Sequence, residues 1–179
     1  MSEKGSSNEI RPATLEDSDE MAVLLSQLGY PADAVSVRRR LEVILARADY
    51  RVMVAAERDE KLAGMVSACW GLYLEHDGRW GRVIALVVSE RMQNQGLGRR
   101  LLAEAESWLR SSGAIASIIN SSQRRAGAHR FYERRGYRAT GIRFEKPLGP
   151  ARGATPPPQS SRAGLSESRM TGAPASTRH

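Results

Sequence analysis

The chain has 179 residues, of which 41% are apolar and 26% are charged. This composition is typical of one globular domain and is too apolar for a wholly disordered protein. A single cysteine excludes an internal disulfide, and one cysteine with three histidines disfavours a structural zinc site. The net charge of +7 is compatible with nucleic acid, anionic surfaces or a phosphorylated ligand, so charge alone does not choose among these partners.

Both ends of the chain have the composition of unfolded polypeptide. Residues 1–8 are polar and lack the apolar segment of a signal peptide. From Gly149 onward the chain is rich in Pro, Gly, Ser and Arg, and it offers too little apolar surface to offset chain entropy. We therefore predict disordered ends at 1–8 and 149–179, a folded domain over 9–148, no membrane-spanning segment and a cytoplasmic location.

The first third of the folded part predicts a strand and two helices. Residues 9–12 predict a short strand, and Thr14 precedes Asp17 at the spacing of a capping box. Apolar residues at helical spacing then predict a helix that ends at Gly29. A second helix is predicted over 33–47; its arginine run Arg38–Arg40 forms either a solvated helix face or a nucleic-acid patch, and the first is the commoner meaning.

Three strands are predicted next. Two β-prone segments, 50–57 and 62–73, flank the polar turn 58–61, and a second turn follows at 75–78. Residues 82–89 contain a continuous apolar run, which is typical of a strand covered on both faces. Cys69 lies in an apolar segment, so we interpret it as a buried structural thiol rather than a nucleophile.

The last third predicts a helix over 98–112, a buried strand over 114–119, a helix over 125–134 that ends before Gly136, and a final strand over 137–146. The predicted order is therefore β-α-α-β-β-β-α-β-α-β, an α/β fold. Because the fourth and fifth strands, 82–89 and 114–119, flank the long helix in a strand–helix–strand unit, we expect them to be parallel and joined by a right-handed crossover.

The loop Gln93-Asn94-Gln95-Gly96-Leu97-Gly98 lies between a buried strand and a helix. Glycine allows a ligand to approach the backbone closely, and a helix start presents unpaired N–H groups with a partial positive charge. The loop is therefore a candidate anion site suited to phosphates, although a tight turn alone would explain two glycines. It lacks the third glycine of a dinucleotide fingerprint and the Gly-Lys-Ser/Thr ending of a P-loop.

Two segments together resemble a known family. Gln93-x-x-Gly96-x-Gly98 resembles the Gln/Arg-x-x-Gly-x-Gly/Ala signature of the GCN5-related N-acetyltransferase (GNAT) superfamily, and it likewise follows a strand and opens a helix. Ala128–Tyr137 is similar to the family's Ala-x-x-Phe-Tyr-x-x-x-Gly-Phe segment, with Tyr137 at the last position. The spacing and the element order also fit, so the resemblance covers residues 9–148. It implies a single GNAT-like domain whose mixed central sheet has helices on both faces and two splayed parallel strands.

The resemblance also implies that the chain is an acetyl-CoA-dependent N-acetyltransferase. In such an enzyme a primary amine attacks the CoA thioester directly and takes its acetyl group. The resemblance further implies that the backbone of Leu86, Val87 and Val88 pairs with the pantetheine arm. The pyrophosphate would then be bound by the amides from Gln93 to Arg99, that is by Gln93, Asn94, Gln95, Gly96, Leu97, Gly98 and Arg99. No metal is expected.

Tyr132 is the side chain to which the resemblance gives a chemical role. The family's tyrosine at this position hydrogen-bonds the cofactor sulfur and is often called the general acid. A phenol has a pKa of about 10 and a thiol of about 8.5, so complete proton transfer is uphill by roughly 2 kcal/mol. We therefore expect a hydrogen bond to the developing thiolate, whereas the residue alone would equally suit helix packing.

The chain departs from the family pattern at two positions. The strand that precedes the signature, here 83–86, often carries an acid that accepts the amine proton, and this chain has none. Arg125 stands where an asparagine often precedes the Phe-Tyr segment, with Asn120 or Ser121 as partial substitutes. The general base is therefore unassigned, and Glu75, His76 and Asp77 are weak candidates on a polar turn. This absence motivates an alternative, an acyl-CoA-binding module with little or no catalysis.

The sequence does not identify the acceptor amine. A small molecule and a peptide are both compatible with it, as are a monomer and a homodimer, while a nucleic-acid partner leaves the signature unexplained. Acidic residues of the 75–78 turn would attract a cationic amine. Four aromatic residues form either a wall of the acceptor site or part of the core: Tyr30, Trp70, Tyr73 and Trp80.

Overall fold

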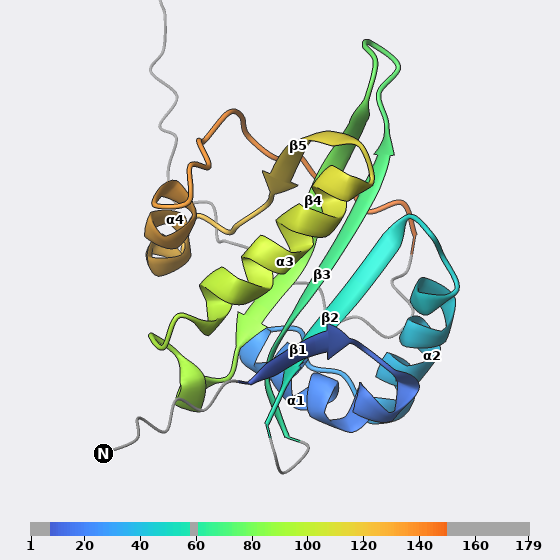
Figure 1. Cartoon of the computed structure of the whole chain (residues 1–179), viewed down its shortest axis with the longest axis vertical. Helices are drawn as coiled ribbons and strands as arrows, with labels where there is room; N and C mark the ends of the chain where they lie inside the picture. Colours follow the sequence, from blue (N-terminus) through green and yellow to red (C-terminus); the bar gives the residue numbers. More distant parts are fainter. Residues whose placement is uncertain (1–7, 58–60, 150–179) are drawn as a thin grey trace, which may run out of the picture.

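The computed structural model describes residues 8–57 and 61–149 of the chain. One mixed sheet forms its centre, and helices cover both faces of that sheet (Figure 1). The elements, in chain order, are β1 (Glu9–Pro12), the 3-10 turn η1 (Leu15–Asp17), α1 (Ser18–Leu28), α2 (Ala34–Leu45), β2 (Tyr50–Ala56), β3 (Leu62–Leu72), β4 (Arg79–Val88), the 3-10 turn η2 (Glu90–Met92), α3 (Leu97–Ser111), β5 (Ala114–Ile119) and α4 (Ala126–Glu133).

The sheet has its five strands in the order of the sequence, β1-β2-β3-β4-β5. Neighbours are antiparallel from β1 to β4, whereas β4 and β5 are parallel and are joined through α3. The predicted parallel unit and its crossover helix are therefore confirmed. A bulge at Ser67 and Ala68 of β3, opposite Ala85 and Val83, leaves Ile84 of β4 without a register partner.

Two apolar cores hold the helices onto the sheet. On one face, α3 packs its leucines Leu101, Leu102 and Leu109, all nearly inaccessible to solvent, against β2, β3 and β4. On the opposite face, α1 and α2 pack Leu24 and Leu41 against β2 and β3. These residues follow the helical spacing that the sequence displays, so burial of each apolar stripe fixes which face of each helix meets the sheet.

The entry into α1 is fixed by local polar contacts. The Thr14 amide donates to the Asp17 carboxylate at 2.7 Å, and the Asp17 amide donates to the Thr14 carbonyl at 3.3 Å. Arg11 of β1 adds two hydrogen bonds of 2.8 Å to the same carboxylate. The predicted capping box is confirmed, and Asp17 also ties the first strand to the first helix.

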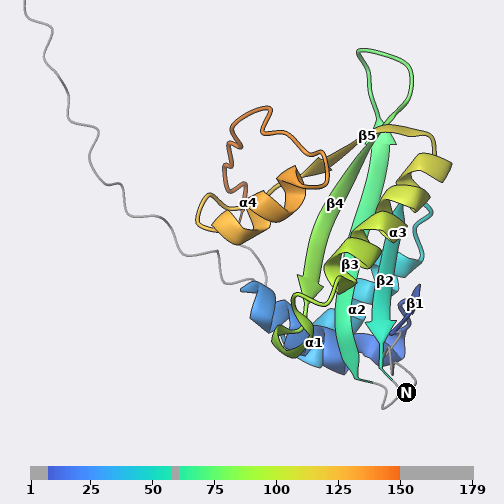
Figure 2. The same ribbon diagram turned by 60° about the vertical axis from the view of Figure 1, so that its left-hand side comes forward.

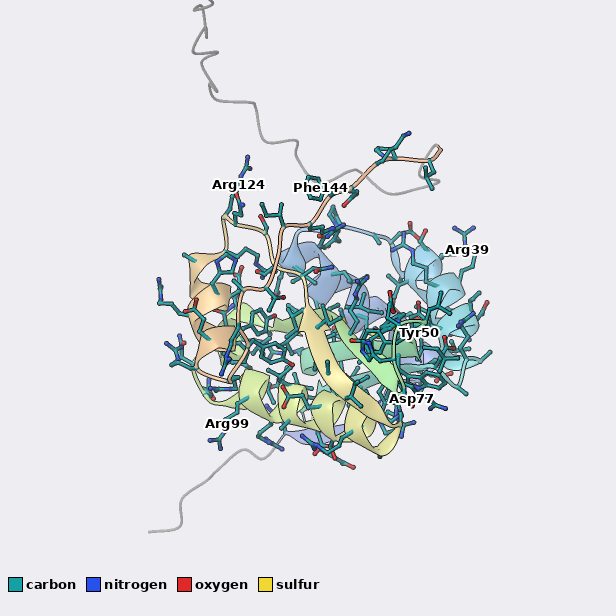
Figure 3. The ribbon with its side chains drawn as sticks, turned by 90° about the horizontal axis from the view of Figure 1, so that it is seen from above. Arg39, Tyr50, Asp77, Arg99, Arg124 and Phe144 are labelled. Atoms are coloured by element: carbon teal, nitrogen blue, oxygen red, sulfur yellow. The ribbon has the colours of Figure 1, made fainter. Side chains whose placement is uncertain are left out.

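The predicted final strand over 137–146 is wrong. Residues 138–148 form no strand, and their side chains Ile142 and Phe144 are 78% and 90% exposed. An alternating apolar pattern produces a strand only when one of its faces has a partner to cover, and this segment packs on neither core. In its place an irregular segment runs to the side of the sheet that carries α1 and α2, where Phe144 lies (Figure 3).

The prediction that residues 114–119 are a buried strand is wrong in its burial. The strand forms with those bounds, but Ile115 is 61% exposed. The physical reason is that no strand pairs with the outer edge of β5 among the described residues, so β5 is an edge strand. A run of small and branched residues is compatible with either position.

Two further expectations lie mainly outside the described residues. The turn 58–61 contributes Lys61 alone, and the disordered ends contribute Asn8 and Gly149 alone. Asn8 is buried, and its carbonyl accepts a hydrogen bond of 2.7 Å from Arg100 of α3. In the described ranges, no helix has both the length and the apolar character needed to cross a bilayer.

The core beneath α3 predicts a large stability effect. Leu101→Ala removes a side chain with no solvent exposure, so the free energy of unfolding should fall by about 2–5 kcal/mol. The same change at Leu72, which is 73% exposed at the end of β3, should cost about 0.5 kcal/mol or less. Urea titration of both variants checks this; equal losses would contradict the packing of α3 described above.

Candidate functional site

The two parallel strands separate before β4 ends. The last β4–β5 pair joins Val83 to Ile119, where β5 stops. The remaining part of β4, from Ile84 to Val88, continues with β3 on one edge and, among the described residues, no strand on the other (Figure 2). The backbone N–H and C=O groups along this edge are therefore open to another hydrogen-bonding partner.

The loop after β4 forms a cradle of unpaired amides. None of the backbone amides from Gln93 to Gly98 donates to an acceptor within residues 8–57 and 61–149. Asn94 and Gly96 have φ angles of 62° and 80°, and such left-handed residues turn successive N–H groups toward one side of the backbone. The start of α3 adds its partial positive charge. This geometry suits a phosphate group.

Arg99 takes a different role from the rest of the loop. Its amide donates to the Gly96 carbonyl at 3.1 Å, so it begins the hydrogen bonding of the helix and is not open to a ligand. Leu97, a second member of the predicted set, is buried and packs in the α3 core. Hence Leu97 offers its backbone to a ligand, whereas its side chain anchors the loop.

A cavity of about 250 Å³ lies beside the open edge of β4. It brings together Leu86, Val87 and Val88 with Gln93, Gly98 and Tyr132, all of them predicted site residues; Asn94, Gln95, Gly96, Leu97 and Arg99 are not on its wall. Its wall also contains five residues outside the predicted set: Gln27, Glu90, Arg125, Ala128 and Phe131. Of these, Arg125 had a sequence signal, whereas Gln27 and Glu90 belong to no motif. Gln27 reaches the cavity because α1 packs beside β4, and Glu90 lies in η2, directly after that strand.

Tyr132 lies on the cavity wall with its hydroxyl group unbonded by the described part of the chain. Its ring packs edge-on against Phe131 and Tyr137, with centroids 5.3 Å and 5.8 Å away. Burial raises the pKa of the Tyr132 phenol above its usual value of 10.0, and the nearby cation of Arg125 opposes that rise. The phenol is therefore protonated at neutral pH and is able to donate a hydrogen bond into the cavity.

The hydroxyl group of Tyr137, unlike that of Tyr132, is hydrogen-bonded to other described residues. Its hydroxyl group donates to the Glu106 carboxylate of α3 and shares a hydrogen bond with Ser117 of β5, each at 2.8 Å. Burial first, and then the adjacent Glu106, raise the pKa of Tyr137 well above its usual range. This network connects the end of α4 to α3 and β5, and so holds the helix that carries Tyr132.

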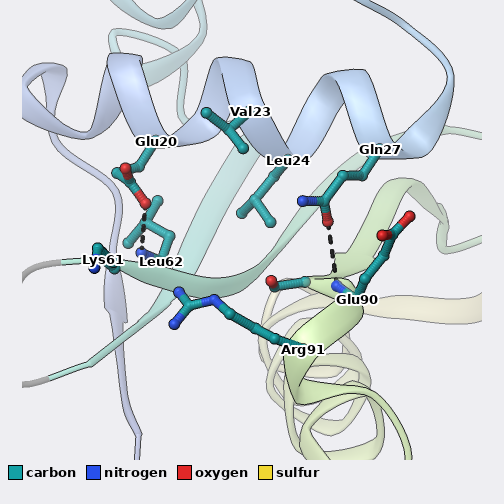
Figure 4. Close-up of a pocket in the computed structure, with 9 residues that line it drawn as sticks. Glu20, Val23, Leu24, Gln27, Lys61, Leu62, Glu90 and Arg91 are labelled. Carbon is teal, nitrogen blue, oxygen red and sulfur yellow. Dashed lines mark hydrogen bonds between the residues drawn. The ribbon is translucent and has the colours of Figure 1, made fainter.

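A larger cavity, of about 360 Å³, lies between α1 and the start of β3 (Figure 4). It shares Gln27 and Glu90 with the first cavity but contains none of the predicted site residues. Its polar lining is largely bonded to the protein, since Glu20 accepts from the Leu62 amide at 3.1 Å and Gln27 accepts from the Glu90 amide at 3.3 Å. The smaller cavity has the open donors, so it is the better candidate for a reaction site.

The four aromatic residues proposed as an acceptor wall do not form one. Tyr30 is half exposed after α1, and Tyr73 stacks on His76 in the hairpin at 4.1 Å. Trp70 packs with the α3 core, under the guanidinium of Arg79 at 3.8 Å. Trp80, at the start of β4, pairs in register with Gly71 and donates from Nε1 to the Leu72 carbonyl at 3.2 Å.

The acids of the 75–78 turn lie at an exposed hairpin tip, where Figure 3 shows Asp77 at the rim of the molecule. Cys69 is buried as predicted, and burial raises the pKa of its thiol, which keeps it from acting as a nucleophile. Within the described ranges, no group of three or more His, Cys, Asp or Glu side chains is placed to hold a metal ion.

Comparison with known proteins identifies relatives of this chain. The model of the Acetyltransferase (GNAT) family matches residues 19–137. Aminoalkylphosphonate N-acetyltransferase of Salmonella typhimurium is 34% identical over 145 residues, which cover 78% of this chain and 91% of the relative.

Solved structures share the fold. The transcriptional regulator of Bacillus halodurans superposes with a TM-score of 0.72 at 21% identity, over 78% of this chain and 99% of that one. Glucosamine-6-phosphate N-acetyltransferase of Arabidopsis thaliana gives 0.68 at 23% identity, over 79% and 98%. A GNAT family acetyltransferase of Staphylococcus aureus gives 0.67 at 24% identity, over 78% and 98%.

Removal of the hydroxyl group should affect stability differently at the two tyrosines of this site. Tyr137→Phe removes the hydroxyl bonded to Glu106 and Ser117, so the free energy of unfolding should fall by about 1–2 kcal/mol. Tyr132→Phe removes a hydroxyl that makes no hydrogen bond to the described residues, so stability should stay within about 0.5 kcal/mol of wild type. Chemical denaturation of both variants measures the difference, and a larger loss for Tyr132→Phe would contradict the assigned contacts.

Proposed function

The chain belongs to the acetyltransferase (GNAT) family and is an N-acetyltransferase, and we propose that it moves the acetyl group of acetyl-CoA to the primary amine of a small molecule. We place the donor in the 250 Å³ cavity beside the open edge of β4, within a catalytic domain over 9–148. One observation carries this assignment. Six consecutive amides, Gln93 to Gly98, have no acceptor in the described chain at the point where a helix begins.

The cradle and the strand edge fit the two polar parts of acetyl-CoA. A pyrophosphate would accept hydrogen bonds from the amides of Gln93 to Gly98 and gain from the start of α3. The open edge of Leu86–Val88 would pair with the amide groups of a pantetheine arm as a neighbouring strand would. Arg125 on the cavity wall adds a cation for a phosphate, and Arg99 adds a second in the first turn of α3.

A buried polar atom beyond β5 supports the same fit. The Ser121 hydroxyl oxygen is buried without a hydrogen-bond partner among residues 8–57 and 61–149. Buried hydroxyl groups are normally hydrogen-bonded, because leaving one unpaired costs about 1–3 kcal/mol. Ser121 lies two residues after the end of β5, where the chain has left β4. We therefore assign its hydroxyl group to the pantetheine arm, in place of the asparagine that the family often has where this chain has Arg125.

Tyr132 is the residue to which we assign the leaving group. The acetyl thioester supplies the electrophilic carbon, and the sulfur leaves with the bonding electron pair when the neutral amine nitrogen bonds to that carbon. The proton that this nitrogen loses passes, in net terms, to the thiolate, so the products are the amide and the CoA thiol. Burial favours the protonated phenol, so Tyr132 donates a hydrogen bond to the charge that develops on sulfur. Such a donor stabilises the transition state more than the ground state, which raises kcat rather than affinity.

A small-molecule amine is the acceptor class that the comparisons favour. The Salmonella relative is named for aminoalkylphosphonates, which are short primary amines carrying a phosphonate group. For this chain we propose an acceptor of similar size, because the relative covers 78% of the chain, including the loop, β4 and α4.

The cradle predicts that Gly96→Glu abolishes acetyl-CoA binding. The new side chain adds a carboxylate beside the phosphate-binding amides and strains a residue whose φ is +80°. Gly113→Glu is a matched control, since Gly113 has a φ of +82°, equally open surroundings and a place at the other end of α3. Calorimetric titration with acetyl-CoA measures both; retained binding by the Gly96 variant, or equal loss in the control, would refute the placement of the pyrophosphate.

Tyr132→Phe should lower kcat by roughly 10- to 100-fold, because a hydrogen bond to a charged group contributes about 1.5–3 kcal/mol. The KM for acetyl-CoA should stay near the wild-type value, since the ring contacts with Phe131 and Tyr137 are retained. Release of CoA is followed spectroscopically with a saturating amine. An unchanged kcat would show that Tyr132 is a packing residue.

A further inference from the structure

One region of the sheet, on the face opposite α3, is not covered by the core that α1 and α2 form in the described part of the chain. On that face β4 contributes Val87 alone to the core formed with α1 and α2. Upstream of Val87, a row of side chains runs across the strands in register, from Tyr50 of β2 through Cys69 and Arg82 to Ile118 of β5. This row crosses β4 one residue before its last pair with β5 and so borders the point where the two strands separate.

Arg82 points to this uncovered face. Its neighbours Gly81 and Val83 face the other way, toward α3, where a Cβ on Gly81 would lie 2.8 Å from Leu109. Side chains alternate along a strand, so Arg82 lies on the side of α1 and α2. Cys69 of β3 is the register partner of Arg82, and directly opposed residues of antiparallel strands share a face, so both side chains lie on this side of the sheet.

No carboxylate of the described ranges pairs with Arg82, and its side chain is exposed. Its one ring contact is with Trp80, 5.9 Å away. Nearby arginines are engaged instead, since Arg47 pairs with Asp49 at 2.6 Å and Arg79 donates to the Ser112 carbonyl at 2.7 Å. A guanidinium with five donors and no anionic partner, on a surface of aromatic and aliphatic groups, is suited to a bound oxyanion.

We propose that Arg82 binds an oxyanion on the acceptor, so that the preferred substrates are short primary amines carrying a phosphonate or phosphate group. The inference rests on the proposed function: with the pyrophosphate at Gln93–Gly98 and the pantetheine arm along Leu86–Val88, the thioester at the other end of that arm would lie beside Ile84–Leu86. Each strand residue advances about 3.3 Å, so the Arg82 backbone lies roughly 7–13 Å from these positions and its long side chain covers part of that span. Two or three carbons then separate an amine at the thioester from an anion at the guanidinium.

The surroundings of Arg82 suit the remaining parts of such a substrate. Ile118 of β5 is the register partner of Arg82, and Ile84, half exposed, follows two residues along β4, so both offer apolar contact to a short alkyl chain. Arg82 therefore acts as a positioning residue, which holds the acceptor by its oxyanion and directs its amine toward the thioester.

The test compares acceptors of equal chain length that differ in charge. Steady-state kcat/KM is measured for 2-aminoethylphosphonate, phosphoethanolamine and ethanolamine with wild type, Arg82→Gln and Arg82→Lys. Wild type should prefer either oxyanion over ethanolamine by about 10- to 100-fold, and the glutamine variant should lose most of that ratio through a higher KM. The lysine variant, which keeps the charge, should retain part of it.

Arg51→Gln is the matched control, because Arg51 is exposed on β2, two strands away in the same sheet, and points to the opposite face. It should leave the ratio unchanged, and thermal melting should show both glutamine variants folded. A wild-type enzyme without preference for the oxyanions, or an Arg82→Gln variant that lowers all three kcat/KM values equally, would overturn the inference while acetyl transfer stands. Absence of both an acetyl-CoA thermal shift and CoA release with every amine would overturn the proposed function as well.

Discussion

The parallel pairing of β4 with β5 is the constraint on which the site depends. It ends at Val83 and Ile119, and β4 continues to Val88 with hydrogen bonds on its β3 edge alone. If β5 extended as far as β4, its backbone would occupy the edge that the cavity now exposes. The chain instead leaves β5 at Ile119 and returns as α4, which places Phe131 and Tyr132 on the wall of the cavity that Leu86 and Val88 also line. One shortened pairing thus creates both the cavity and its tyrosine wall.

The packing of α4 makes this arrangement stable without a continuous sheet. The helix is eight residues long and has no fully buried residue, so it gains little from burial alone. Its end is held by Tyr137, whose hydroxyl reaches Glu106 of α3 and Ser117 of β5. A polar network in a largely apolar contact fixes geometry more than it adds stability, which suits a helix that must place a reacting side chain.

The proposed mechanism divides β4 between two anions. The loop after β4 presents unpaired amides to the donor's phosphates, whereas Arg82, near the other end of the strand, presents a guanidinium to the acceptor's oxyanion. Between them lies the segment from Ile84 to Val88, where the acetyl group would be transferred. The proposed ligands of the amides after β4 and of Arg82 are both phosphorylated or phosphonylated small molecules. Positive charge at these places therefore serves small anionic ligands and does not require nucleic acid as a partner.

The sequence by itself determined most of the elements and the position of the glycine loop between β4 and α3, to which we assign the donor. Periodicity predicted every strand and helix up to α4, because each buries a stripe of matching period, and the signature Gln93-x-x-Gly96-x-Gly98 located the amide cradle. Tertiary structure decided the rest. The strand pattern over 137–146 found no partner, and β5 was left at an edge, because burial depends on neighbours that a local pattern does not contain. For the same reason Gln27 and Arg82 had no signal: only the folded sheet places one beside the cavity and leaves the other without an anion.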